Sequence, residues 1–431
     1  MSFSYPRLHC ILPTAIGLIL MANLNLSAEN WPTWRGDLAG SGHSQENQLP
    51  TTWGQQKNVS WRIDLPDRGN STPVIWKDRI FVSQAIEEEN FRGLLCFDKK
   101  DGSLLWKKGT TYSQKEKTHK ANPYCSASPT TDGERVIVSY GSAGLYCYDL
   151  DGKQLWQRDF GPLTHIWGNA ASPLIYGDLC IFYHGPDKTN GQLTALNKKT
   201  GETLWQYQEP QWQPIKRTDG FKGRDKGGVI GSWSTPILIS TKSGDQLVMA
   251  FPTQVKAFAP KTGEELWTCD GLNPLIYTSP IFSQGTLVAM GGYYGNTVAV
   301  KTEGKGDVTQ SQRQWLKVRD HGGIGTGVIK DGHIYSQDGD GKLYCTNLQN
   351  GELQWQQKLP GKARTWGSLL LSGDHIYTLS QAGESVIFKA KPTAYQQIAH
   401  NQINEKTNSS IAVSNGNLFI RTWKGLWCIG E

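Results

Sequence analysis

Eleven side chains with binding or acid–base chemistry stand in short segments that come before similar small-residue steps in the sequence. They are His119, Asn122, Tyr124, His165, Trp167, Asn169, Trp233, Tyr277, His321, Arg364 and Trp366. Imidazole and phenol groups can move protons, while indole rings and amides can hold a flat, polar-edged ligand. A sugar or an extended peptide could use such a set. The alternative is that these side chains only pack together and cap the ends of strands.

Other patterns that could carry chemistry are better interpreted as structure. Asp338-Gly339-Asp340-Gly341 resembles part of a Ca²⁺ loop but lacks the downstream bidentate glutamate, so we expect a tight turn. The glycine-rich stretch 322–327 is not followed by a helix whose N-terminus could bind phosphate. No histidine pair has zinc-site spacing, and no G-x-S-x-G elbow occurs. We therefore assign no catalytic residue and no metal ligand.

The elements that must position the eleven side chains are set by an internal repeat of about 40–60 residues, the period of propeller blades. One half of the unit ends in G-x-x-x-W. It occurs as GSLLW (102–106), GKQLW (152–156), GETLW (201–205), GEELW (263–267) and GELQW (351–355). An alternating apolar strand precedes each match, which predicts a β-hairpin with a glycine turn. The tryptophan offers a large flat surface to the neighbouring blade.

The other half of the unit opens with a small residue, often followed by proline, and a second hairpin. Eight openings occur, at 71–83, 127–139, 171–183, 234–240, 278–290, 325–337, 367–379 and 409–421. Each unit then has four antiparallel strands, which is the unit of a β-propeller. We predict an all-β, eight-bladed propeller with about 32 strands and very little helix.

The two ends of the chain do not match the repeat. The eighth unit stops after its third strand, at Leu426–Ile429, whereas residues 59–63 near the start form an isolated fourth strand with its tryptophan. We predict that this N-terminal strand completes the last blade, because such closure removes two exposed sheet edges. The alternative is seven blades and a stray hairpin.

Repeat phase predicts where the eleven side chains lie. Segments between the fourth strand of one blade and the first strand of the next emerge on one face, around the mouth of the axial channel. We therefore expect the eleven side chains, with His184 nearby, to form a funnel-shaped ligand site. The alternative, in which they only pack against one another, stays open.

The sequence resembles the PQQ-like β-propeller repeat family over nearly all of the chain after residue 28. The resemblance lies in the openings, in the closure and in the [A/C]-[L/F/Y]-[D/N]-x-x-[T/D]-G-x-x-x-W units. That superfamily includes quinoprotein alcohol dehydrogenases and the propeller lipoprotein of the outer-membrane β-barrel assembly machinery. Residues 31–44, with 49–53, also resemble a subgroup of exported bacterial propellers. The resemblance implies the fold, but not one function.

A catalytic function has little support in this sequence. Quinoprotein dehydrogenases cover the quinone with a disulfide between adjacent cysteines, and this chain has no adjacent pair. No Asp or Glu matches their Ca²⁺ ligands or catalytic base, and only Trp233 could serve as a stacking floor. We expect no cofactor and a non-catalytic binding or scaffold protein. The alternatives are a PQQ-dependent oxidoreductase with Ca²⁺, and a polysaccharide hydrolase or lyase that uses funnel His and Tyr.

Composition agrees with an exported binding protein. The net charge of +6 is spread along the chain without a basic stripe, so we expect a protein or glycan partner and no nucleic acid. The basic cluster around Lys216–Lys226 is interrupted by two aspartates and is interpreted as a solvated loop. Residues 1–28 have the pattern of a secretory signal, cleaved or retained as an anchor. We expect residues 29–431 to be one propeller domain, monomeric and periplasmic or extracellular.

The cysteines occupy a repeated position. Cys96, Cys147, Cys345 and Cys428 stand in equivalent slots, which hold Ala195 and Ala257 in other repeats. A slot that accepts either Cys or Ala indicates a small buried position, so we expect free thiols there. Equivalent positions in neighbouring blades should also be too far apart to form disulfides.

Overall fold

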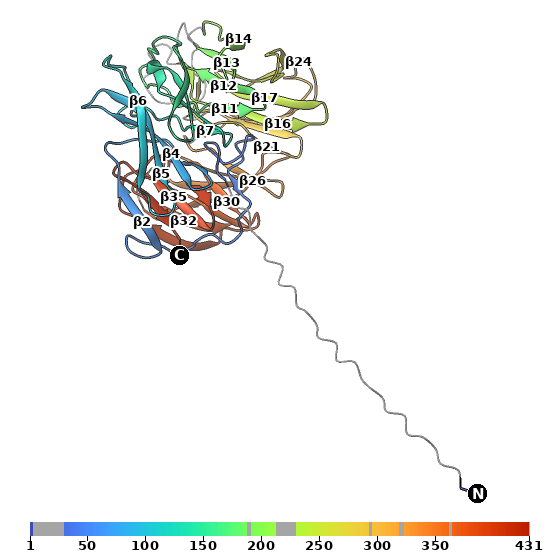
Figure 1. The fold of residues 1–431 in the computed structure, drawn as a ribbon. Helices are drawn as coiled ribbons and strands as arrows, with labels where there is room; N and C mark the ends of the chain where they lie inside the picture. The colour runs from blue at the N-terminus through green and yellow to red at the C-terminus, as the bar shows by residue number, and fades with distance from the viewer. Residues whose placement is uncertain are drawn as a thin grey trace.

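The computed structural model describes residues 1–2, 30–187, 191–212, 230–292, 295–318, 323–361 and 364–430. Within them the chain forms a ring of eight antiparallel blades, and Figure 1 shows the early strand β2 beside the C-terminal strands. The described part contains 36 strands and one short 3₁₀ turn, Gly141–Ala143. The predicted all-β, eight-bladed propeller is confirmed.

Each blade runs from an inner strand at the axis to an outer strand at the rim. The blades are β3 (Val74–Trp76), β4 (Arg79–Ile86), β5 (Phe91–Asp98), β6 (Leu104–Thr111); β7 (Thr130–Thr131), β8 (Arg135–Ser139), β9 (Leu145–Asp149), β10 (Gln154–Arg158); β11 (Leu174–Tyr176), β12 (Leu179–His184), β13 (Gln192–Asn197), β14 (Thr203–Gln208); β16 (Ile237–Thr241), β17 (Gly244–Phe251), β18 (Gln254–Phe258), β19 (Glu265–Asp270); β21 (Ile281–Ser283), β22 (Thr286–Met290), β23 (Thr297–Lys301), β25 (Arg313–Lys317); β26 (Val328–Lys330), β27 (His333–Gln337), β28 (Lys342–Asn347), β29 (Leu353–Lys358); β30 (Leu370–Ser372), β31 (His375–Tyr377), β32 (Glu384–Lys389), β33 (Gln397–Gln402); and β34 (Ala412–Ser414), β35 (Asn417–Arg421), β36 (Gly425–Ile429), β2 (Val59–Asp64).

Four short strands lie outside this pattern. β1 (His43–Ser44) pairs in parallel with β30, and β24 (Gly306–Asp307) pairs in parallel with β19. β15 (Gly231–Ser232) and β20 (Leu275–Ile276) form a small parallel pair. The strand count therefore exceeds the expected 32 because non-repeat segments add strands to a complete ring.

Ring closure occurs as the sequence predicts. β2 pairs antiparallel with β36, with Trp61 opposite Cys428 and Ile63 opposite Leu426. The alternative of seven blades with a stray hairpin is wrong, because the N-terminal strand supplies the outer strand of the eighth blade. Pairing with β2 covers the edge that β36 would otherwise expose.

The G-x-x-x-W motif joins neighbouring blades. In seven of the eight blades the small slot of the third strand lies opposite the tryptophan of the fourth strand, as in Cys96–Trp106 and Ala195–Trp205, whereas the seventh blade pairs Ile387 with Ala399. Across six junctions the indole N–H then donates to a backbone carbonyl of the next blade, at 2.9–3.1 Å. Gly102 has φ +73°, and a Cβ there would come within 2.9 Å of the Trp61 ring of the preceding blade. Glycine is therefore needed both for the turn and for the docked ring.

The cysteines occupy the positions predicted for them. All seven from Cys96 to Cys428 are buried free thiols. Burial raises the pKa of the Cys96 and Cys147 thiols to about 12, which keeps them protonated at neutral pH. The slot is small because a tryptophan lies directly across from it.

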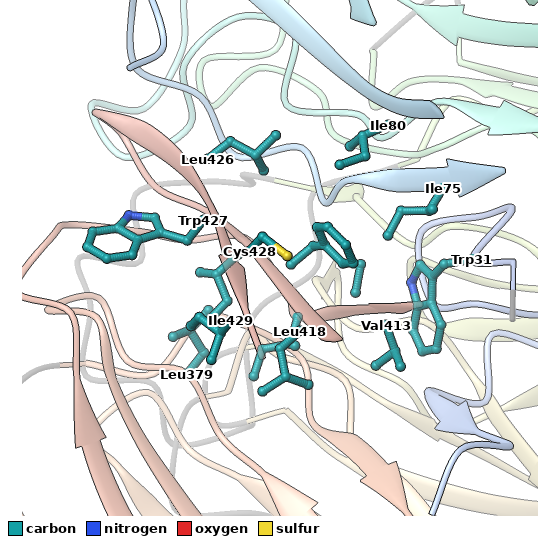
Figure 2. Close-up of a cluster of buried hydrophobic side chains, with 14 of the residues drawn as sticks. Trp31, Ile75, Ile80, Leu379, Val413, Leu418, Leu426, Trp427, Cys428 and Ile429 are labelled. Atoms are coloured by element: carbon teal, nitrogen blue, oxygen red, sulfur yellow. The ribbon is translucent and has the colours of Figure 1, made fainter. Parts of the chain in front are cut away.

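Residues 30–44, here called the plug segment, cross one end of the axial channel. Trp31 exchanges both backbone hydrogen bonds with Ile75 of the first blade and is 1% exposed. Figure 2 shows its ring beside Ile75 and Val413, in a cluster of buried side chains that also includes residues of β36. The same segment accepts backbone hydrogen bonds from Thr131, Leu238 and Leu371, in three further blades.

Arg35 fixes the plug segment to the ring. Its guanidinium is buried and donates to four carbonyls, those of Gly40 and Ser41 in the plug segment and of Thr326 and Gly327 in the sixth blade. Burial lowers the pKa of Arg35 to about 9, although the charge of nearby Asp37 opposes this shift.

Among the described residues, no helix has the length and apolar character needed to cross a membrane.

Candidate ligand-binding funnel

A closed ring of hydroxyl groups surrounds the channel axis and explains the small-residue step of the repeat. One Ser or Thr of each blade accepts a hydrogen bond from the backbone N–H of its counterpart in the preceding blade, at 2.8–3.1 Å. The members, here called the hydroxyl ring, are Thr72, Ser128, Ser172, Thr235, Ser279, Thr326, Ser368 and Ser410. Each ring member stands two residues before its inner strand, outside the blade's sheet, so its N–H needs such an acceptor.

The hydroxyl ring separates two different ends of the channel. The plug segment bonds to Ile75, Thr131, Leu238 and Leu371, each three residues after a member of the ring. The connecting segments that carry the candidate site residues come before the ring in each blade. Because every inner strand runs in the same direction, the plug segment closes one end, and the connecting segments form an open mouth at the other.

A cavity of about 270 Å³ fills the channel between mouth and plug. The described residues that line it are Trp34, Asn70, Thr72, His119, Asn122, Ser126, Ser128, Trp167, Ala170, Ser172, Trp233, Thr235, Tyr277, Ile324, Trp366, Ser368, Asn408 and Ser410. Trp34 belongs to the plug segment, so the cavity is blind: its side chain forms the floor. The sequence offered only Trp233 as a candidate stacking floor, but Trp233 lies in the side wall with His165, Trp167 and Tyr277.

One side of the wall is an aromatic cluster from three successive blade junctions. The Trp233 ring centroid lies 4.8 Å from that of His165, 5.8 Å from that of Trp167 and 5.2 Å from that of Tyr277. Trp233 is 9% exposed and donates its indole N–H to the Gly168 carbonyl at 2.8 Å, whereas Trp167 is half-buried. Trp233 therefore supports the wall, and Trp167 presents a face to the cavity.

The opposite side of the mouth is a hydrogen-bonded lip. The Ala121 carbonyl accepts from the amides of Asn70 and Asn408, at 2.8 and 2.9 Å. This contact carries the chain at 119–122 over the junctions on both sides of the eighth blade. His119 then meets Trp366, with ring centroids 6.2 Å apart. The lip narrows the mouth over one sector of the ring.

The lining is electrically neutral. Among the described lining residues there is no Asp, Glu, Lys or Arg. Burial, and then the charge of Lys120, lower the pKa of His119, so its imidazole is neutral at pH 7. The His119 Nδ1 accepts a hydrogen bond from the Ala121 backbone N–H at 3.2 Å, which leaves Nε2 as the protonated nitrogen.

The structure brings together six of the eleven side chains singled out from the sequence. His119, Asn122, Trp167, Trp233, Tyr277 and Trp366 line the cavity, and His165 packs behind Trp233. Repeat phase therefore located the mouth correctly, while the role of these residues as ligand contacts stays a prediction. His321 lies outside the described residues.

Three of the eleven, and His184, lie elsewhere. Tyr124 packs under Arg92, whose guanidinium carbon is 3.5 Å from the ring centroid, and it shares a separate small cavity with Asn169. Arg364 is exposed, and its carbonyl accepts a hydrogen bond from the Gln381 N–H. His184 is buried in the third blade, with its Nε2 3.1 Å from the Gly161 carbonyl oxygen. Phase alone could not show which side chains turn away from the axis.

Sequence reasoning missed Trp34 and the hydroxyl ring as parts of the site. The signal for the ring was the small residue that opens each repeat unit. In seven of the eight units this Ser or Thr stands directly before proline, glycine or leucine. No local pattern marks Trp34, because the plug segment stands outside the repeat. Asp338-Gly339-Asp340-Gly341 is a turn as expected: Asp338 Oδ1 accepts from the N–H groups of Asp340 and Lys342.

The lining does not fit a quinone with Ca²⁺. Such a cofactor carries carboxylates that need cationic or metal partners, and Ca²⁺ needs several oxygen ligands that include carboxylates. The described lining supplies neither, and within the described ranges no three His, Cys, Asp or Glu side chains come together as a metal site. We therefore derive no redox step from this cavity.

The geometry defines a closed eight-bladed propeller with a blind axial funnel. The family profile described as "Outer membrane protein assembly factor BamB" matches residues 92–357, 253–394 and 325–430. The chain therefore belongs to this PQQ-like β-propeller family. The BamB protein of Moranella endobia is 23% identical over 328 residues, which cover 72% of this chain and 74% of that protein.

Solved structures confirm the fold. BamB from Moraxella catarrhalis superimposes with a TM-score of 0.58 at 16% identity, covering 85% of this chain and 98% of that one. Quinohemoprotein alcohol dehydrogenase from Comamonas testosteroni gives a TM-score of 0.68 at 13% identity, covering 92% and 77%. At these identities the likeness concerns the fold alone.

Proposed function

We propose that this chain is an exported, non-catalytic binding or scaffold protein that holds a ligand in the blind funnel. The observation that supports this most directly is the neutral, aromatic lining of a cavity that opens on one face only. Ligand sites are usually concave and mostly apolar, with a few convergent polar groups. The relatives that share its family are named as assembly factors of outer membrane proteins, which agrees with a role in binding.

Acid–base catalysis has less support than binding. A hydrolase or lyase needs two positioned groups that exchange protons with the substrate, and their pKa values must suit the working pH. In the described lining His119 is the only imidazole, its pKa is lowered, and no carboxylate stands beside it.

The proposal that the protein is exported rests on the signal pattern of residues 1–28, and we expect a monomer in the periplasm or outside the cell.

A binding screen with matched tryptophan variants tests the proposal. Purified protein would be screened by intrinsic fluorescence and calorimetry against neutral and acidic glycans and a short-peptide library. For any ligand found, we expect Trp167→Ala to weaken binding about 10-fold or more, which corresponds to about 1.4 kcal/mol. Trp167 is half-buried, so its loss should change the melting temperature little.

The controls separate the site from packing. Trp76→Ala removes an equally half-buried indole that comes after the hydroxyl ring, on the plugged side, and should leave binding unchanged. Trp233→Ala should lower stability by about 3 kcal/mol, because it truncates a buried, hydrogen-bonded ring. If no ligand binds, and both Trp167→Ala and His165→Ala lower the melting temperature strongly, the aromatic cluster is only structural.

A further inference from the structure

We propose that the funnel recognises the end of an uncharged glycan chain, which enters through the mouth and stops against Trp34. This inference rests on the proposed function, because it names the ligand class of the same site. It combines three properties of the cavity. The lining is uncharged, it offers both aromatic rings for stacking and hydroxyl groups for hydrogen bonds, and the plug segment closes its floor.

Neutrality favours a sugar over the end of a peptide. Both ends of a peptide carry a charge, and burying an ammonium or carboxylate without a partner is costly. The described lining offers no ion partner, and the pKa of its only imidazole is lowered. An uncharged sugar meets no such penalty.

The polar groups of the lining match sugar hydroxyls. Each oxygen of the hydroxyl ring accepts one backbone N–H, so its own proton is directed to other acceptors, and six of the eight members line the cavity. Asn122 donates through Nδ2 to the Trp167 and Asn169 carbonyls, which leaves its Oδ1 as an acceptor. Sugar hydroxyls both donate and accept, and therefore suit a wall of neutral donors and acceptors.

The aromatic rings supply faces for stacking. Trp167, Trp366 and Trp34 are half-buried and come from the wall, the lip and the floor. The C–H faces of a pyranose ring are apolar and pack on flat rings, while its equatorial hydroxyls reach the polar groups between them. The three indoles stand on different sides of the cavity, so they can hold a single ring inserted from the mouth.

The closed floor selects a chain end. Trp34 is fixed by the plug segment, which bonds to blades all around the ring. A polymer cannot thread through a channel that is closed at one end, and a cavity of about 270 Å³ has room for a terminal unit and not for a looped chain. A glycan that lay across the mouth would touch Trp167 and Trp366 but not Trp34.

Calorimetric titration with linear neutral oligosaccharides tests the class of ligand. The probes are maltoheptaose, cellohexaose, laminarihexaose, xylohexaose, mannohexaose and chitohexaose, with hexagalacturonate as the acidic comparison. We expect at least one neutral oligosaccharide to bind, more tightly than hexagalacturonate. Tighter binding of the acidic oligosaccharide, or no binding of any neutral one at millimolar concentration, would overturn the inference.

End-on entry makes a second, separate prediction. A long polymer with the same linkage should compete with the bound oligosaccharide in proportion to its number of chain ends. At equal mass the polymer has far fewer ends than the oligosaccharide, so it should compete only weakly. Equal competition at equal mass would show side-on binding. Trp34→Ala should weaken binding at least 10-fold while Trp76→Ala does not. If Trp34→Ala lowers the melting temperature, Trp34→Phe replaces it.

Failure of this inference can be distinguished from failure of the proposed function. If short peptides bind with loss in Trp167→Ala while no neutral oligosaccharide binds, the funnel is a binding site with another ligand class. If neither class binds and Trp167→Ala changes only stability, both proposals are wrong.

Discussion

The two ends of the channel are formed by the same eight inner strands, yet they differ in what completes them. At the plugged end the backbone of residues 30–44 bonds to several blades, and a buried arginine joins it to the sixth. At the mouth the junctions are held by the short β15–β20 pair and by side chains, such as the amides of Asn70 and Asn408 and the indole of Trp233. The repeat places its connecting segments at one end only, because all inner strands run in the same direction, and the plug segment, which lies outside the repeat, closes the other end.

This difference separates stability from binding. The plugged end is held by backbone hydrogen bonds and by a buried guanidinium. A substitution there should lower the free energy of unfolding, because it leaves buried polar groups without hydrogen-bond partners. The mouth has half-buried rings, Trp167 and Trp366, and we expect the blades to stay intact when one of them is removed. Substitution of Arg35 at the plugged end should therefore act on folding, and substitution of the half-buried Trp167 at the mouth should act on ligand affinity.

Deleting residues 30–64 should have the largest effect, because it removes both the plug segment and β2. The eighth blade then loses its outer strand, and the edge of β36 becomes exposed. We expect aggregation and loss of a cooperative thermal transition, measured by light scattering and calorimetry against a chain that begins at residue 30. A deleted chain that stays monomeric with unchanged melting would contradict both the closure and the contrast between the ends.

Arg35→Met should lower the free energy of unfolding by about 3 kcal/mol. The substitution leaves four carbonyls, three of them buried, without their charged donor, while the methionine fills part of the volume. Urea denaturation measures the loss, and Arg68→Met, at a surface ion pair with Glu87, is the matched control. Equal and small losses for both variants would mean that Arg35 does not fix the plug segment.

Two buried ionisable groups in the third blade should give opposite pH dependences. Burial lowers the pKa of His184 to about 4, so the unfolded chain takes up its proton first and stability falls as the pH drops from 6.5 toward 4. Burial, with the neighbouring Asp187 charge, raises the pKa of Glu209 to about 7, so stability falls as the pH rises from 4.5 toward 7. Each contribution is about 3 kcal/mol.

Single variants separate these two contributions. His184→Gln should remove the loss on the acid side, and Glu209→Gln should remove the loss toward neutral pH, in denaturation series between pH 4 and 8. If both variants keep the parent's pH profile, His184 and Glu209 are not buried as described.

Cys96→Ala should have the smallest effect, about 1 kcal/mol or less. Its slot accepts alanine in other blades and lies mid-blade, away from both ends of the channel. Ala195→Cys is the reverse control, and chemical denaturation measures both. Alkylation of unreduced, denatured protein should modify Cys96, Cys147, Cys345 and Cys428. A loss of several kcal/mol, or a disulfide between any two of them, would show that the slots are not equivalent.

The amino-acid sequence alone determined the repeat and its direct consequences. Five G-x-x-x-W matches and eight openings set the strand order, the closure by residues 59–63 and the face that carries His119, Trp167, Trp233, Tyr277 and Trp366. These features are local or periodic, because turn glycines, alternating apolar residues and a constant phase leave their pattern in every blade.

Only the tertiary structure decided how the channel ends. Arg35 reaches carbonyls about 290 positions away in the chain, and Trp34 becomes the floor of a cavity lined by all the blade junctions. Tyr124 has the right phase but turns away from the axis, because it packs on Arg92 and its hydroxyl bonds to the backbone of Glu116; it shares a separate small cavity with Asn169. Contacts of this range depend on where non-repeat segments pack, and no spacing in the sequence records that packing.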